Sequence, residues 1–331
     1  MSNAGDSIAV ALERLAAGRP VAIPTETVYG LAADALDDVA VQGVFTLKRR
    51  PPTNPLIVHV SDVSMAQEVI RGWDGRGERL AEAFWPGPLT MIYPKAPTVP
   101  GIVTAGGSTV AVRVPRHPLA LELIRQHGEP LVAPSANPSG YVSPTSAGHV
   151  REHFTEEEVY VLDGGPCLEG LESTVIDMTR EVPTILRPGV IGAAAIAEVL
   201  RSEVRSGVST AFGTTRSPGV EGPHYQPVAP VVLASTIAAV TELLERVTGF
   251  AVVLPPPTAS IAIEPPHMIL AMPHNAREYA RELYASLRQA DAMRPSAIIV
   301  GLPDASSSEG DEAAIWLAVH ERLRRAAARG T

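Results

Sequence analysis

The sequence predicts an α/β protein with two domains joined by a long linker. In residues 1–201, short apolar runs of strand length are mixed with amphipathic helical patterns. The periodicity fails over residues 202–230, where Ser, Gly, Thr and Pro accumulate. In residues 231–331, strand and helix patterns alternate regularly. We therefore expect a first domain with a twisted mixed sheet and flanking helices, a linker, and a smaller Rossmann-like domain.

The first domain contains several strand patterns with no helical pattern between them, which favours a mixed sheet. One helix is expected to begin at Asp37 or Asp38 and to end near Lys48. The other predicted helices span residues 7–17, 63–70, 77–84, 118–127, 146–154 and 192–201. The predicted strands span residues 21–23, 56–60, 89–93, 109–114, 131–133, 159–162, 173–177 and 184–186.

The second domain has the simpler pattern. Strands are predicted near residues 230–233, 250–254, 268–271 and 297–300, and helices near 235–247, 275–290 and 311–328. No Gly-x-Gly-x-x-Gly fingerprint occurs, so the Rossmann-like pattern does not indicate dinucleotide binding. Within the linker, residues 217–227 are too rich in specific polar and aromatic residues for a simple spacer.

Composition limits the possible functions. The net charge of −9 argues against a protein that grips nucleic acid over a broad face, although a local basic cleft is compatible with it. The single cysteine, Cys167, excludes an internal disulfide framework and a multi-cysteine zinc site. No apolar run approaches the length of a membrane span, and the first residues do not resemble a secretory signal. We expect a cytoplasmic protein without a membrane partner.

Residues 48–59 form the most informative stretch of the first domain. Lys48, Arg49 and Arg50 lie where a predicted helix ends, and the prolines that follow hold the chain extended. These cations could simply complement the negative end of the helix dipole. Alternatively, Lys48 and Arg50 could bind phosphate or carboxylate. Lysine occurs only at positions 48 and 95, so a lysine here is mildly informative.

Other polar residues cluster at predicted strand ends and in tight loops, where ligands of open α/β sheets bind. Each has a structural interpretation, such as an Asx turn for Ser135 and Asn137 or a structural ion pair for Arg113 and Arg187. Together they supply hydroxyls, amides, a histidine and cations without an obvious nucleophile–base pair, which favours positioning of phosphates and carboxylates. The set comprises Thr25, Thr27, Lys48, Arg50, Asn54, His59, Thr109, Arg113, His117, Ser135, Asn137, Ser143, Ser173, Thr174 and Arg187.

Three known catalytic motifs would indicate a different chemistry. The phosphate-binding P-loop and the Gly-x-Ser-x-Gly elbow of serine hydrolases are absent. His149-Val-Arg-Glu-His153 matches the inverted zinc-protease signature His-x-x-Glu-His. Only three letters of that signature are fixed, so a solvated helix face is the preferred interpretation of this segment.

Seven motifs in order resemble the YrdC-type threonylcarbamoyl-AMP synthase family over about residues 7–200. They are Pro24-Thr-Glu-Thr-Val-Tyr-Gly30, Lys48-x-Arg50-Pro-x-x-Asn54-Pro-Leu-x-x-His59, Trp85-Pro-Gly-Pro-Leu-Thr90, Val112-Arg-Val-Pro-x-His117, Pro134-Ser-Ala-Asn-x-Ser-Gly140, Ser173-Thr-Val175 and Leu186-Arg-Pro-Gly189. Ser217-Pro-Gly219 and His224-Tyr-x-Pro227 resemble the longer branch, in which the linker folds over the active site of the YrdC-like domain.

The resemblance implies synthesis of threonylcarbamoyl-adenylate and pyrophosphate from L-threonine, bicarbonate and ATP, with Mg²⁺ bound through the ATP phosphates. It also implies a downstream tRNA-modifying complex as a partner and at most a weak contact with tRNA. It assigns catalysis to Lys48 and Arg50. It assigns L-threonine to Thr27, His59, Arg113, Ala133 and Ser173, and ATP to Arg50, Asn54, Thr109, Ser135, Asn137, Ser143, Arg187 and Tyr225.

Three other functions compete with this one. The same cleft could bind RNA without catalysis, although no interleaved aromatic platform accompanies its cations. Carbamoyl transfer from carbamoyl phosphate is the second, because related domains occur in hydrogenase-maturation proteins. The zinc hydrolase is the third. The motifs favour the synthase over all three.

Overall fold

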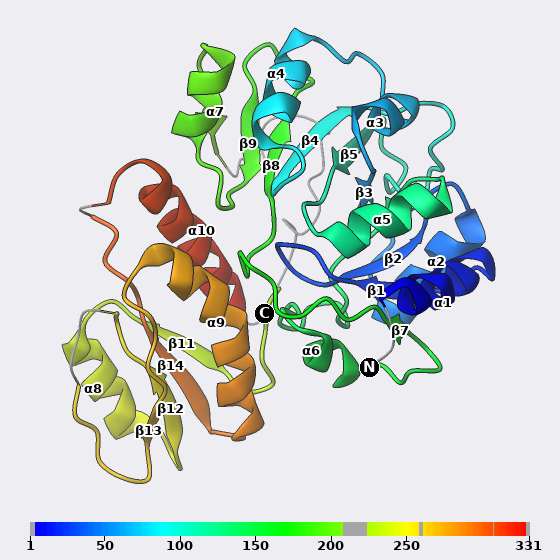
Figure 1. The fold of residues 1–331 in the computed structure, drawn as a ribbon. Helices are drawn as coiled ribbons and strands as arrows, with labels where there is room; N and C mark the ends of the chain where they lie inside the picture. The colour runs from blue at the N-terminus through cyan, green and yellow to red at the C-terminus, as the bar shows by residue number, and fades with distance from the viewer. Residues whose placement is uncertain (1–3, 208–223, 258–260, 307, 329–331) are drawn as a thin grey trace.

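The computed structural model describes residues 4–207, 224–257, 261–306 and 308–328. Within these residues the strands form two separate sheets, one of ten strands and one of four. We use "large-sheet unit" for residues 4–207 and "C-terminal unit" for the described residues from 231 onward. The two units lie against each other, and the helices Ala276–Ala292 and Gly310–Ala327 form the side of the C-terminal unit that faces the large-sheet unit (Figure 1).

The large sheet is mixed, as predicted. Its strand order is β10-β9-β8-β4-β5-β3-β6-β2-β1-β7, with parallel pairs such as β3–β5 and antiparallel pairs such as β4–β5. The strands are β1 (Val21–Ile23), β2 (Gly30–Asp34), β3 (Ile57–His59), β4 (Leu89–Pro94), β5 (Thr109–Arg113), β6 (Leu131–Val132), β7 (Tyr160–Val161), β8 (Thr174–Asp177), β9 (Thr184–Arg187) and β10 (Arg205–Ser206).

Helices α2 and α5 begin where their capping residues predict, whereas α1 and α4 begin three and two residues before their predicted starts. Asp37 accepts hydrogen bonds from the amides of Val39 and Ala40 at the start of α2, and Pro118 occupies the first turn of α5. The helices are α1 (Ala4–Ala16), α2 (Asp38–Lys48), α3 (Val63–Val69), α4 (Gly75–Phe84), α5 (Pro118–His127), α6 (Ala147–Arg151) and α7 (Ala193–Leu200).

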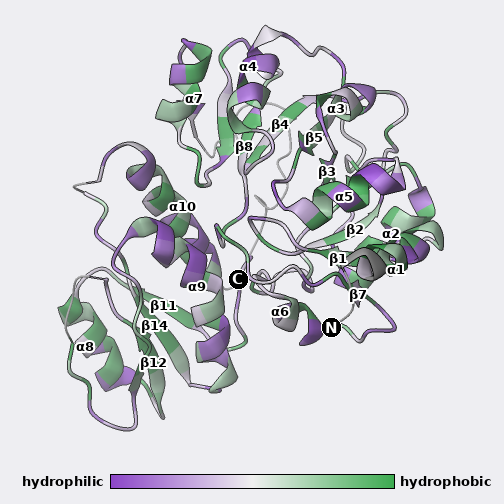
Figure 2. Ribbon diagram, viewed as in Figure 1, coloured by the Kyte–Doolittle hydropathy of each residue, from purple (hydrophilic) through white to green (hydrophobic). Residues whose placement is uncertain are grey.

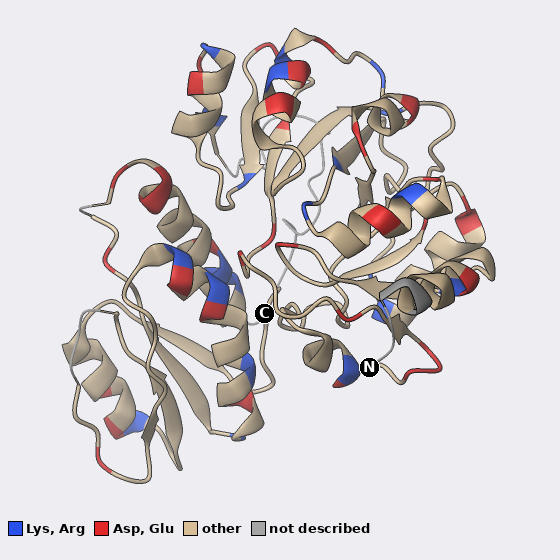
Figure 3. Cartoon of the chain, viewed as in Figure 1, with Lys and Arg blue, Asp and Glu red and all other residues tan. Residues whose placement is uncertain are grey.

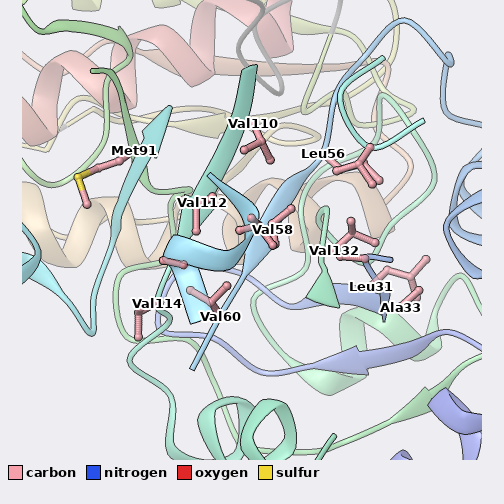
Figure 4. Packing of buried hydrophobic residues seen from close by; sticks show 14 of the residues in the cluster. Leu31, Ala33, Leu56, Val58, Val60, Met91, Val110, Val112, Val114 and Val132 are labelled. Atoms are coloured by element: carbon pink, nitrogen blue, oxygen red, sulfur yellow. The ribbon is translucent and has the colours of Figure 1, made fainter. Parts of the chain in front are cut away.

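The main core lies at the centre of the large sheet. Val58 of β3 pairs with Val112 of β5 on one side and with Val132 of β6 on the other, and all three are at most 1% exposed. Figure 4 shows their side chains grouped with those of Leu31 and Val60. Because β-branched residues pack well on a pleated surface, these apolar strands hold the strand ends in a defined position.

The C-terminal unit has a wholly parallel sheet in the order β11-β14-β12-β13, which agrees with the Rossmann-like prediction. Successive side chains of β12 and β14 face opposite sides, so Val252 and Ile298 pack toward α9 and α10 while Val253 and Ile299 pack toward α8. Figure 2 shows the strands of this sheet mostly in green, the colour of apolar residues. The elements are β11 (Val231–Ala234), α8 (Ile237–Arg246), β12 (Ala251–Leu254), β13 (Met268–Ile269), α9 (Ala276–Ala292), β14 (Ala297–Gly301) and α10 (Gly310–Ala327).

The structure differs from the sequence prediction in two strands and at several element boundaries. Strand β2 was missed because its sequence, Gly-Leu-Ala-Ala-Asp, lacks the β-branched residues that indicate a strand. Strand β10 lies inside the predicted linker and pairs with β9, so the large sheet continues past residue 202. Helix α6 ends at Arg151, three residues before its predicted end. No helix among the described residues is long and apolar enough to cross a membrane.

Candidate functional site

A cavity lies at the ends of β3, β5 and β9, where the linker meets the large-sheet unit. Nine of the fourteen residues that the resemblance assigns to catalysis or substrate binding line it: Thr27, Arg50, His59, Arg113, Ala133, Ser135, Ser173, Arg187 and Tyr225. They come from eight separate segments of the chain, so the fold brings them together. The remaining five, Lys48, Asn54, Thr109, Asn137 and Ser143, are not among the lining residues.

One wall of the cavity is organised around Arg113. Its Nη2 lies 2.6 Å from Glu26 Oε1, and its Nη1 donates to Thr27 Oγ1 at 2.9 Å. Its Nε donates to the Gly87 carbonyl at 3.1 Å. Thr25 Oγ1 lies 2.8 Å from Thr27 Oγ1, so the two threonines continue this network. These contacts hold a buried guanidinium at the cavity in one orientation.

His59 lies beside this cation at the end of β3. Its side chain is buried, and Nδ1 has no hydrogen-bond partner within the described part of the chain. Burial first, and then the nearby charge of Arg113, lower the pKa of His59 from 6.5 to about 3. The imidazole is therefore neutral at physiological pH and has an unused polar atom in a residue that lines the cavity.

A second wall contains Ser173 and Arg187. The Arg187 guanidinium donates from Nε and Nη2 to the Ser173 carbonyl, and from Nη2 to Ser173 Oγ at 3.1 Å. Ser173 Oγ also lies 2.7 Å from Thr90 Oγ1. The Ser173 hydroxyl is thus held between an arginine and a threonine.

Arg50 is the third arginine at the cavity. Its Nε and Nη2 donate to the carbonyls of Asn54 and Pro55, at 3.1 and 2.8 Å, across the turn predicted from the prolines. Burial, followed by the charge of Arg187, lowers the pKa of Arg50 to about 10. Because Arg50 and Arg187 are both positively charged and buried, an anion bound beside them would be stabilised.

Lys48 lies behind the cavity. Its Nζ donates to the carbonyl of Ser135 and, at 2.6 Å, to that of Asn137, and the side chain is buried. Burial and then the charge of Arg50 lower its pKa. In this structure the ammonium therefore ties the 134–140 loop to the end of α2.

Three of the other four non-lining residues also support neighbouring loops. The Asn137 side-chain amide donates to the carbonyls of Pro138 and Tyr141, both at 2.9 Å. Ser143 Oγ donates to Glu172 Oε1 at 2.7 Å. Asn54 accepts from Arg50 through its backbone. The fourth, Thr109, begins β5 and is half-buried.

Sequence reasoning assigned no role to three polar site residues, Glu26, Glu172 and His224, although Glu26 and His224 lie in motifs that carry the family resemblance. Glu172 and His224 line the cavity, and Glu26 pairs with Arg113 in its wall. Two signals were available in the sequence. Glu26 stands between Thr25 and Thr27, and Glu172 stands two residues before the buried strand β8. Burial lowers the pKa of His224 to about 3, despite the opposing effect of Glu172.

The zinc-protease pattern does not form one helix face. His153 lies beyond the end of α6, and His149 Nδ1 accepts from the Thr145 amide. His153 Nε2 lies 3.2 Å from Arg288 of the C-terminal unit, so the preferred interpretation of a solvated face was also wrong there. No group of three potential metal-ligating His, Cys, Asp or Glu side chains occurs within the described ranges.

Comparisons with known proteins agree with this geometry. A family model of the Sua5, YciO and YrdC proteins, described as telomere recombination, matches residues 13–189. A second, described as the C-terminal domain of threonylcarbamoyl-AMP synthase, matches residues 191–328. A threonylcarbamoyl-AMP synthase of Pyrococcus abyssi is 38% identical over 93% of this chain and 90% of its own length.

Two further relatives extend the comparison. A threonylcarbamoyl-AMP synthase of Bacillus subtilis is 43% identical over 70% of this chain and 68% of its own length. The crystal structure of P. abyssi Sua5 complexed with L-threonine superimposes with a TM-score of 0.85 and 36% identity. That match covers 97% of this chain and 94% of the other, so it includes both sheets.

Proposed function

The chain belongs to the Sua5, YciO and YrdC family, and on this basis we propose that it synthesises threonylcarbamoyl-adenylate from L-threonine, bicarbonate and ATP, releasing pyrophosphate. The observation that carries the proposal is the convergence of Arg50, Arg113 and Arg187 on one cavity. ATP, bicarbonate and the adenylate product are anions, and L-threonine carries a carboxylate. Arginine binds carboxylate and phosphate through paired donors.

L-threonine is proposed to bind on the Arg113 side. Arg113 would bind its carboxylate, while Thr27, His59 and Ser173 would contact its amine and hydroxyl. A neutral His59 suits this role, because it offers an uncharged polar atom beside the cation. Ala133 would limit the space around the substrate, and the complex of P. abyssi Sua5 with L-threonine supports this class of ligand.

ATP is proposed to bind on the side of Arg50 and Arg187. Ser135 and Tyr225 line the same cavity and would contact the nucleotide. The non-lining residues assigned to ATP, Asn54, Thr109, Asn137 and Ser143, would act by shaping the loops around it. We propose that Mg²⁺ enters with ATP as part of the substrate, held by the phosphates. The carboxylates of Glu26 and Glu172 are both paired with arginines, which fits a metal carried by the nucleotide.

The reaction requires the substrates to be aligned by the protein and needs no covalent intermediate with a side chain. The deprotonated threonine amine attacks bicarbonate, or the carbon dioxide that bicarbonate forms by taking up a proton and losing water. The nitrogen gives up a proton to solvent as the carbamate forms, and a carbamate oxygen then attacks the α-phosphorus while pyrophosphate leaves. Arg50 and Arg187 would stabilise the charge that develops on the phosphates. Lys48 would contribute by holding the 134–140 loop, or by moving its ammonium to the phosphates when nucleotide binds.

The chemistry of the product indicates which kind of protein acts after this one. An acyl-adenylate is reactive, so a downstream tRNA-modifying complex is proposed to consume it, with no more than weak contact between this chain and tRNA. A cytoplasmic location accompanies this proposal.

The test is pyrophosphate release measured with and without L-threonine and bicarbonate, with the nucleotide product identified by mass. Release should require both substrates, and the product should be threonylcarbamoyl-adenylate. Arg50→Met should reduce release at least tenfold, whereas Arg49→Met is the matched control because Arg49 is the exposed neighbour. No release by folded wild-type protein with Mg²⁺ present would overturn the proposal.

A further inference from the structure

Glu172 is a carboxylate of the cavity wall whose partners come mostly from the other unit. Its Oε1 accepts from Ser143, but its Oε2 accepts from Tyr284 of α9 at 2.9 Å and from Arg322 of α10 at 3.1 Å. The Arg322 side chain is completely buried. Figure 3 shows arginines in blue along α9 and α10, the helices of the C-terminal unit that lie toward the large-sheet unit.

This placement raises an electrostatic problem for a site that binds ATP. Glu172 lines the same cavity as Arg50 and Arg187, and an anion there opposes the binding of phosphates. Burial alone would raise its pKa, yet the charges of Arg322 and Arg187 and the Ser143 hydrogen bond together lower it to about 2. Glu172 is therefore ionised at neutral pH, and Arg322 is the cation that directly contacts it.

Arg322 also supports the linker side of the cavity. Its guanidinium lies over the ring of Tyr225, 5.7 Å from the ring centroid, and Tyr225 stacks on Tyr284 at 5.4 Å. Tyr225 has a positive φ of 63°, which is uncommon for a residue other than glycine and needs support from its surroundings. Arg322 and Tyr284 thus contact both Glu172 and Tyr225.

We propose that Arg322 is a positioning residue for ATP binding: from the C-terminal unit it neutralises Glu172 and holds its carboxylate away from the cavity arginines. Without Arg322, the Glu172 carboxylate turns to Arg187, the other cation that acts on it, and competes with the ATP phosphates. The proposal rests on the proposed function, because it concerns affinity for ATP at the same cavity. It gives the C-terminal unit an electrostatic role in the site.

The test measures binding of a non-hydrolysable ATP analogue with Mg²⁺, and of L-threonine, by calorimetry at a temperature where all variants are folded. Arg322→Met should weaken binding of the analogue at least tenfold and that of L-threonine less than threefold. Adding E172Q to this variant should recover the analogue affinity to within about threefold of wild type, because the amide is neutral. Arg277→Met is the matched control: Arg277 pairs with Glu169 between the units and does not line this cavity.

The outcomes separate the two proposals. If wild-type protein does not bind the analogue, the proposed function fails. If wild type binds it and Arg322→Met binds equally well, only the role of Arg322 fails. If Arg322→Met and Arg277→Met weaken both ligands alike, or if E172Q brings no recovery, Arg322 serves only to dock the units and the proposal is overturned.

Discussion

Arg113 and Glu26 form a buried ion pair in the cavity wall, with Nη2 and Oε1 2.6 Å apart and both side chains at most 4% exposed. The second Glu26 oxygen accepts from the Arg116 amide at 2.9 Å. The carboxylate therefore fixes the arginine and joins it to the loop that follows β5. Fixing Arg113 and joining it to this loop both depend on Glu26, to which the sequence analysis assigned no role of its own.

Glu26→Gln should destabilise the protein by about 3 kcal/mol, because breaking a buried pair leaves a charge without compensation. Urea unfolding without ligands measures this. Glu242→Gln is the control, since Glu242 and Arg246 form an exposed pair on α8 whose loss should cost less than about 0.5 kcal/mol. Equal, small effects of the two substitutions would contradict a structural role for the Glu26 pair.

Lys48→Met should loosen the 134–140 loop, because the loop loses both hydrogen bonds from Nζ to its carbonyls. We expect amide exchange at Ala136 and Asn137 to accelerate about tenfold, which corresponds to roughly 1.4 kcal/mol of local stability. Pyrophosphate release should fall at least tenfold.

The other lysine provides the control for this loop. Lys95 Nζ donates to the Val99 carbonyl at 2.7 Å, away from the cavity, so Lys95→Met should leave both measurements unchanged. Reduced turnover of Lys48→Met with wild-type exchange in the loop would instead favour a direct action of Lys48 on phosphate.

His59 should make stability depend on pH below neutrality. Its pKa is about 3 in the folded protein and about 6.5 when unfolded, so only the unfolded chain takes up the proton between these values. Stability is therefore complete above pH 6.5 and falls as the pH drops toward 3, by about 2 kcal/mol at pH 5. In urea unfolding, the loss between pH 7 and pH 5 should be about 2 kcal/mol smaller in His59→Gln. The exposed His274→Gln should match wild type.

Gly30 and Ala133 are close neighbours in the wall of the cavity. A Cβ at position 30 would lie 2.9 Å from Ala133 Cβ, so Gly30→Ala should destabilise the protein by about 1–3 kcal/mol through overpacking. Combining it with Ala133→Gly should recover most of this loss. A double variant as unstable as Gly30→Ala in urea unfolding would place the strain elsewhere.

Much of the fold could be predicted because its signals are local. The caps of α2 and the strand and helix periodicity of the C-terminal unit depend on residues a few positions apart. Strand β2 escaped prediction because its alanines carry no strand preference and are buried by neighbours from other segments. Nine of the predicted site residues line one cavity because polar residues at the ends of adjacent strands converge in a sheet.

The sequence by itself determined most of the element types, the two-part organisation and nine of the residues that line the cavity. Tertiary structure alone decided which atoms meet. Lys48 contacts carbonyls 87 and 89 positions away, and Glu172 finds partners 112 and 150 positions away in another unit. Such pairs depend on how whole sheets and helices pack, and ionic attraction between distant positions leaves no periodic pattern along the chain.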